Sequence, residues 1–110
     1  SHNERAEAAR LDLVIRELGG QRDRAAAQLE GARQIARNVP VQLQAARDAE
    51  QQATARYKAG LGAAVEVADA QRLLTQSEID DALAKLNVWR AMLSAAVASG
   101  NLDDFLDRTQ

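Results

Sequence analysis

The sequence of 110 residues has no cysteine, a single proline and only three aromatic residues. Without cysteine there can be no disulfide, no thiol chemistry and no metal site made of thiolates. With one Trp, one Tyr and one Phe, any core has to be built from small aliphatic side chains. Such a core suits closely packed helices and leaves little room for a cofactor, so we expect no cofactor and no metal.

Long apolar runs and basic, aromatic-rich patches are also missing. No stretch of 18 apolar residues occurs, so we expect no segment to cross a membrane as a helix. The net charge of −2 is unevenly distributed: residues 1–60 hold ten Arg/Lys against eight Asp/Glu, and residues 61–110 hold four against eight. Neither part combines basic residues with aromatic ones, so nucleic-acid binding is not expected.

Alanine is the commonest residue, and Gln, Arg, Leu, Glu and Asp follow it. Ala, Leu, Gln, Arg and Glu lose little free energy on entering a helix, and their abundance is typical of coiled coils. The length fits one domain at most. The composition therefore predicts an all-α chain of the coiled-coil type.

Apolar residues recur at helical spacing through the first half of the chain, and they predict a long helix over residues 4–59. Gly19-Gly20 would loosen this helix locally. Pro40 lacks a backbone donor and crowds the carbonyl four residues before it, so we expect a kink or a break near residues 38–40. The absence of a polar linker there favours a kink.

The stretch RYKAGLGAAVEVADAQ, from Arg56 to Gln71, contains the signals for a reversal of the chain. Gly60 is suited to the left-handed residue that ends a helix, and we expect a positive φ there. Gly62 is expected to serve as a weak N-cap of the next helix. Residues 60–62 are therefore the predicted tip of a hairpin, and so short a loop makes the two helices antiparallel.

A second helix is expected over residues 63–98, with Ser99-Gly100 ending it and a short terminal helix over residues 101–107. Tyr57 and Val65 are expected to pack at the end of the hairpin. The predicted fold is thus a long antiparallel helical hairpin that ends in a short helical turn.

The first predicted helix exceeds the second by about 20 residues, which would leave about 30 Å of helix without a partner. This overhang carries an apolar stripe that includes Leu11, Val14, Ile15 and Leu18. A stripe of this kind is poorly suited to water. We therefore expect the chain to self-associate.

Glu66 and Asp69 lie one helical turn apart just after the tip. The simplest interpretation is an exposed acidic turn, stabilised by the helix dipole, in which Asp69 pairs with Arg72. No nucleophile or metal-binding motif accompanies the two carboxylates, so no catalytic residue and no enzyme activity are expected.

The segment ARYKAGLGAAVEVADAQRLLTQSEIDDAL, together with LNVWRAMLSAAVASGNLDDFL, resembles the second repeat of the TolC-like outer membrane efflux proteins. The shared features are Arg-Tyr-x-x-Gly-Leu, an acidic residue six positions after that Gly, and then Asp-Ala-Gln. The resemblance covers Ala55 to about Leu106, roughly half of the chain. The preceding residues fit the family's long helix more loosely.

This resemblance implies a homotrimer whose hairpins form a periplasmic α-barrel beneath an outer membrane β-barrel, in the bacterial cell envelope. It implies that Gly60, Leu61 and Gly62 lie at the end of the barrel to which a periplasmic adaptor and an inner-membrane pump bind. It also implies that Glu66 and Asp69 face the lumen and line the entrance.

Several features depart from the family pattern. Gly62 stands where relatives often have a polar residue, and Glu66 where Asp is frequent. The membrane strands and the first repeat are absent from these 110 residues. We therefore do not expect this sequence to form a channel by itself or to insert into a membrane. Residues 1–3 are interpreted as a remnant of a cleavage site. The alternative function is a free-standing coiled-coil interaction or scaffold module.

Overall fold

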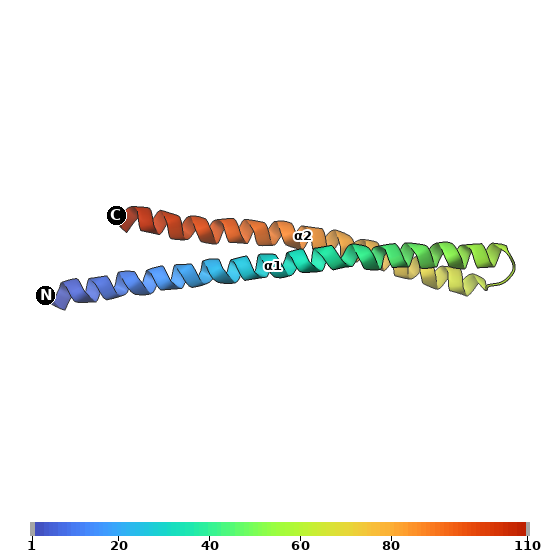
Figure 1. Ribbon diagram of the computed structural model, residues 1–110, viewed down its shortest axis with the longest axis horizontal. Coiled ribbons are helices and arrows are strands. Elements are labelled where there is room, and N and C mark those ends of the chain that lie inside the picture. The colour runs from blue at the N-terminus through green and yellow to red at the C-terminus, as the bar shows by residue number, and fades with distance from the viewer. Residues whose placement is uncertain (1, 110) are drawn as a thin grey trace. The chain divides into compact units, whose positions relative to one another are not determined.

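The computed structural model describes residues 2–109, which form two α-helices. Helix α1, His2–Lys58, has 57 residues, and helix α2, Ala64–Thr109, has 46. Residues 59–63 join them, and α2 returns antiparallel to α1 (Figure 1). No strand occurs in this described part. The prediction of an all-α antiparallel hairpin is confirmed.

Helix α1 runs through Gly19, Gly20 and Pro40 without interruption, so the predicted alternative of a break at Pro40 is wrong. A proline inside a helix costs about 3 kcal/mol. The side chain of Pro40 is exposed, whereas Leu43 and Ala46, one and two turns later, are buried. Val39, just before Pro40, is half-buried as well. Packing on both sides of Pro40 keeps the helix continuous, because a break would remove these residues from their positions against α2.

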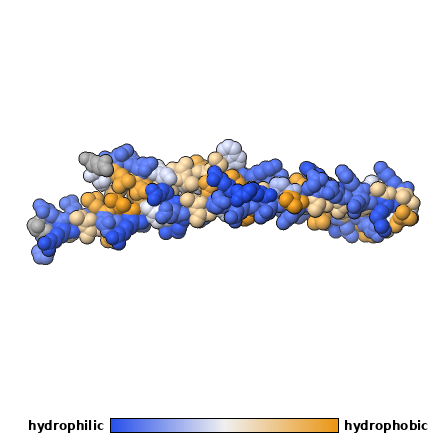
Figure 2. Space-filling view, viewed as in Figure 1, coloured by the Kyte–Doolittle hydropathy of each residue, from blue (hydrophilic) through white to orange (hydrophobic). Residues whose placement is uncertain are grey.

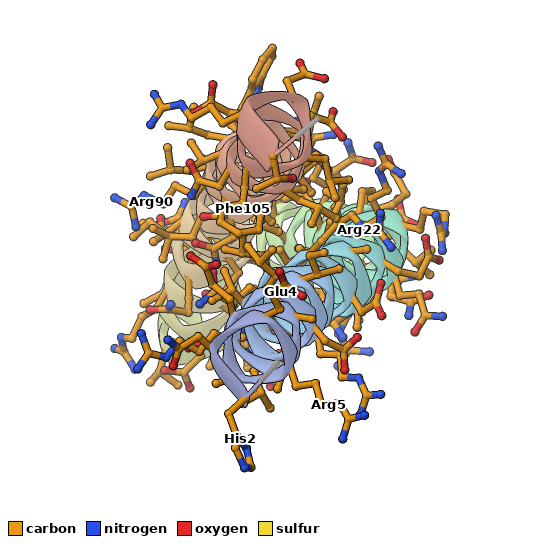
Figure 3. The ribbon with its side chains drawn as sticks, turned by 90° about the vertical axis from the view of Figure 1, so that its left-hand side faces the viewer. His2, Glu4, Arg5, Arg22, Arg90 and Phe105 are labelled. Atoms are coloured by element: carbon orange, nitrogen blue, oxygen red, sulfur yellow. The ribbon has the colours of Figure 1, made fainter. Side chains whose placement is uncertain are left out.

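Helix α2 does not end at Ser99-Gly100, as expected, but continues to Thr109. The predicted separate helix over residues 101–107 is therefore wrong. A glycine inside a helix costs only about 1 kcal/mol relative to alanine. Leu102 is 5% exposed, and Phe105 lies between the two helices in an end-on view (Figure 3). Leu102 is thus buried and Phe105 half-buried, and their packing beyond Gly100 favours the continued helix.

The chain divides into two compact units. The tip unit comprises Ala32–Val88, which is the hairpin around the loop. The terminal unit comprises Ser1–Gly31 and Trp89–Gln110. Each unit contains a segment of both helices, and each is described separately below.

The helices of the tip unit pack along a seam with a regular spacing of three and four residues. On α1, the buried and half-buried positions with this spacing are Ala32, Ala36, Val39, Leu43, Ala46, Glu50 and Ala53, and Thr54 beside them is half-buried too. On α2, they are Val67, Ala70, Leu74, Ser77, Asp81, Ala84 and Val88. This spacing is the heptad pattern of a coiled coil. Its small side chains allow the two helices to approach closely.

In the terminal unit, Val14, Ile15 and Leu18 are half-buried rather than exposed. The predicted overhang of about 20 residues is therefore wrong, because α2 extends to Thr109 and covers this part of α1. Leu11 and Leu13, nearer the start of α1, remain exposed.

The core of the described residues is made of a few alanine and leucine side chains. None of the large side chains is fully buried, and the buried hydrophobic residues are Ala25, Leu43, Ala46, Ala84 and Leu102. Neither helix contains an apolar stretch long enough to cross a membrane.

Candidate functional site at the hairpin tip

The end of α1 is closed by two backbone hydrogen bonds that define a Schellman motif. Gly60 N–H donates to the carbonyl of Tyr57 at 3.0 Å, and Leu61 N–H donates to the carbonyl of Arg56 at 2.8 Å. Gly60 has a φ of 75°, the left-handed conformation that glycine adopts most readily. The expected positive φ at Gly60 is confirmed.

The start of α2 differs from the prediction. The carbonyl of Ala63 accepts the Glu66 N–H at 3.1 Å, and the helix begins at Ala64, so Gly62 is not the N-cap. Gly62 has another role. A Cβ at this position would lie 2.9 Å from Glu66 Oε2 and 3.2 Å from Arg56 Cβ. A side chain here would displace the flexible carboxylate end of Glu66 and press on Arg56 Cβ, so glycine lets both side chains lie close to the loop backbone.

The side chain of Arg56 spans the loop. Its Nη2 donates to the carbonyl of Leu61 at 3.2 Å, and its Nε lies 4.0 Å from Glu66 Oε2. The two side chains are 59% and 51% exposed, so the ion pair contributes at most a few tenths of a kcal/mol. No contact of Arg56 was predicted from the sequence. Nothing in its spacing shows that its guanidinium would reach across the turn to Glu66.

Asp69 pairs with Arg72 at 3.3 Å, as the sequence predicted. The carboxylates of Glu66 and Asp69 are both exposed, and each faces one guanidinium. The acidic turn is therefore locally neutral, because Arg56 and Arg72 balance its two charges.

Three apolar side chains at this end of the hairpin reach the surface, and Figure 2 shows hydrophobic surface here. Leu61 is 72% exposed, Tyr57 52% and Val65 64%. Within a single chain, Tyr57 and Val65 are therefore not buried at the end of the hairpin, and the prediction that they pack there is wrong. Together with Gly60 and Gly62, these residues form an exposed tip with a fixed backbone and apolar side chains.

A second apolar stripe lies on α2 of the tip unit. It consists of Ile79, Leu83 and Leu86, which are all exposed and have the spacing of a seam. Each lies two residues after a seam position (Ser77, Asp81 and Ala84). At 3.5 residues per turn, two residues correspond to about 206°. The seam and the second stripe therefore lie on nearly opposite faces of α2.

The terminal unit also exposes apolar side chains on α2, namely Trp89, Leu93 and Val97. Arg90, between the first two, points away from the neighbouring helix (Figure 3). This part of α2 therefore presents a largely apolar surface to water.

Residues 2–109 contain no pocket and no group of His, Cys, Asp and Glu able to hold a metal ion. No protein-family model matches the chain, and neither a curated protein nor a solved structure matches it. The candidate site is therefore a surface, made of the tip and the second stripe of α2.

Proposed function

We propose that this chain is a structural hairpin of a TolC-like outer membrane efflux or secretion channel, in which it forms part of the periplasmic α-barrel. The second stripe of α2 in the tip unit is the observation that carries the proposal. A helix in a closed ring has a neighbour on each side, so it needs two packing faces. The seam binds α1, and Ile79, Leu83 and Leu86 provide the face for the next hairpin.

In this proposal the native protein is a homotrimer in the bacterial cell envelope, and the tip lies at the periplasmic entrance. Leu61 and its neighbours Gly60 and Gly62 form the surface that binds a periplasmic adaptor and an inner-membrane pump. The side chain of Leu61 is exposed, and the Schellman motif fixes its backbone. This supports the role, because an exposed apolar group on a fixed backbone is suited to binding.

Glu66 and Asp69 line the entrance in this proposal, and rearrangement of the tips opens it. Their exposure supports such a position. A ring of carboxylates would raise the local concentration of cations. Because Arg56 and Arg72 balance these charges within each hairpin, the cation preference depends on how far the two arginines lie from the passage.

The test is bilayer recording of the complete outer membrane channel with Glu66→Ala and Asp69→Ala combined. The change leaves two unpaired guanidiniums, so the four-residue site goes from a charge of zero to +2 per hairpin. Leakage through the closed channel should rise, and the preference for cations should decrease or reverse.

The matched control is Asp103→Ala with Asp107→Ala, which removes two exposed carboxylates near the other end of α2. It should leave the ion selectivity as in the wild type. If the Glu66/Asp69 variant also keeps the wild-type selectivity, the two residues do not line the entrance.

The second candidate function is a free-standing coiled-coil scaffold. The uninterrupted heptad seam of the tip unit favours it, because this seam holds the hairpin together without a surrounding barrel. Electron microscopy of assembled copies separates the two functions: a ring around a central opening supports the conduit, and a compact solid bundle supports the scaffold.

A further inference from the structure

We propose that the second stripe of α2 in the tip unit binds α1 of another copy of this chain, so that parallel hairpins pack side by side. This inference deepens the proposed function, on which it rests for the idea of lateral packing. It adds which helix binds to which, and why.

The stripe is a surface without a partner within the chain. Ile79, Leu83 and Leu86 are separated by four and three residues, which is the spacing that packs into one neighbouring helix. All three are exposed, although they lie in the middle of a helix. Apolar surface of this kind, arranged along a helix, marks an interaction site.

The charges of the tip unit select the helix that binds there. The α1 segment, residues 32–58, has five Arg/Lys (Arg33, Arg37, Arg47, Arg56 and Lys58) and two Asp/Glu, a net charge of +3. The α2 segment, residues 64–88, has two Arg/Lys and five Asp/Glu (Glu66, Asp69, Glu78, Asp80 and Asp81), a net charge of −3.

Pairing of α2 with α2 of a second copy would place −3 against −3, and pairing of α1 with α1 would place +3 against +3. Pairing of α2 with α1 places −3 against +3. Complementary charge steers association and suppresses the wrong partner. The charge distribution therefore favours α1 of the second copy as the occupant of the stripe.

The shape of α1 agrees with this pairing. Val41 and Ala45 lie on α1 two residues after the seam positions Val39 and Leu43, and both are exposed. If the tips of two parallel hairpins are level, Val41 comes near Leu83 and Ala45 near Ile79. Smaller side chains on α1 then face larger ones on α2, so the two helices can approach closely.

This contact uses two different surfaces of the chain and is therefore heterologous. A heterologous contact closes into a ring when its rotation allows and otherwise continues as a filament. Each hairpin has a free α2 stripe on one side and a free α1 face on the other, so pairing can continue until the ring closes.

Sedimentation equilibrium of the full chain over a hundredfold concentration range, at about 0.05 and 0.5 M salt, is the first test. We expect a mass that rises with concentration and association at least severalfold weaker at high salt, because salt screens the attraction between opposite charges. A monomer throughout would overturn the proposal. Association that strengthens with salt would also overturn it, because attraction between opposite charges weakens as salt is added.

A matched pair of variants locates the surface. Leu83→Glu should weaken association at least tenfold, because it places a charge in the middle of the stripe. Leu73→Glu makes the same change at an equally exposed site outside the stripe and should leave association unchanged; the two leucines are 50% and 57% exposed. Circular dichroism of both variants checks that the helices remain folded. Equal effects of the two changes would overturn the assignment.

Disulfide formation identifies the pairing, because the chain has no cysteine of its own. Val41→Cys and Leu83→Cys chains, mixed under mild oxidation, should give mainly the mixed dimer. The Leu83→Cys chain alone should cross-link poorly. Efficient cross-linking of Leu83→Cys with itself would show that α2 binds α2.

The outcomes separate this inference from the proposed function. Suppose that the copies form a ring with the predicted α2-to-α1 contacts, and that the Glu66/Asp69 variant keeps the wild-type ion selectivity. This result would support the pairing and refute the position of Glu66 and Asp69 at the entrance. A changed ion selectivity together with α2-to-α2 cross-links would support the entrance position and refute the pairing.

Discussion

The φ of 75° at Gly60 leads to a specific prediction about stability, because only glycine adopts this conformation without strain. We expect Gly60→Val to lower the free energy of unfolding by about 1–3 kcal/mol. No atom lies within 4 Å of a Cβ built at this position. The Cβ itself meets no neighbour, so the expected loss comes from backbone strain.

The assay is urea unfolding followed by circular dichroism at 222 nm. With a slope of about 1 kcal/mol per M, the lower end of the usual range, a loss of 1–3 kcal/mol moves the midpoint by roughly 1–3 M. Protein concentration has to be held constant, because association of folded chains also raises the apparent stability.

Gly60→Asn is the matched control, because asparagine tolerates the left-handed region better than valine. Its midpoint should lie between those of the wild type and Gly60→Val. Equal midpoints for the wild type and Gly60→Val would refute the reasoning. Equal losses for Asn and Val would refute it as well, because they would point to a cause other than the backbone conformation.

Two further predictions concern single residues of α2. Asp81 lies in the seam, with a side chain that is 13% exposed and 2.8 Å from Lys85 Nζ. Asp81→Leu should raise the free energy of unfolding by about 1 kcal/mol in the same urea assay. Asp80→Leu, at the exposed neighbouring position, should change it by less than about 0.5 kcal/mol. Equal effects of the two changes would contradict the position of Asp81 in the seam. Gly100→Ala should raise the melting temperature, because it removes about 0.5–1 kcal/mol of helix cost where no atom lies within 4 Å of a new Cβ; an unchanged or lower value would show that Gly100 has a role other than that of a helical residue.

The fold could be predicted from the sequence where local and repeating signals agree. The chain reversal was predicted from the stretch that holds Gly60 and Gly62, and the seam of α1 from apolar residues spaced by three and four positions. The seam of α2 was not predicted: its larger apolar residues Ile79, Leu83 and Leu86 have the right spacing but are exposed, and the seam contains Ser77 and Asp81 instead. The end of α2 was mispredicted because Ser99-Gly100 is a local stop signal. The spacing of Ala95, Ala98 and Leu102 continues the seam through it, and packing outweighs the local preference.

The details of the tip could not be predicted, because they depend on side chains that meet across the loop. The contact of Arg56 with the Leu61 carbonyl requires the Schellman geometry, and only that geometry brings Glu66 near. The exposure of Tyr57 and Val65 was missed for a different reason. An apolar residue in a pattern indicates burial, but the pattern does not say whether the covering surface belongs to the same chain.

The closed turn after α1 has a consequence for any molecule that binds the tip. Ordering a flexible loop costs about 1–2 kcal/mol of backbone entropy per residue, and a partner usually has to supply it. Here the Gly60 and Leu61 amides are already bonded to α1, and Arg56 holds the Leu61 carbonyl. Most of that entropy is lost when the hairpin folds. A partner would therefore meet a rigid surface, and the free energy of its contact with Leu61 would go largely into affinity.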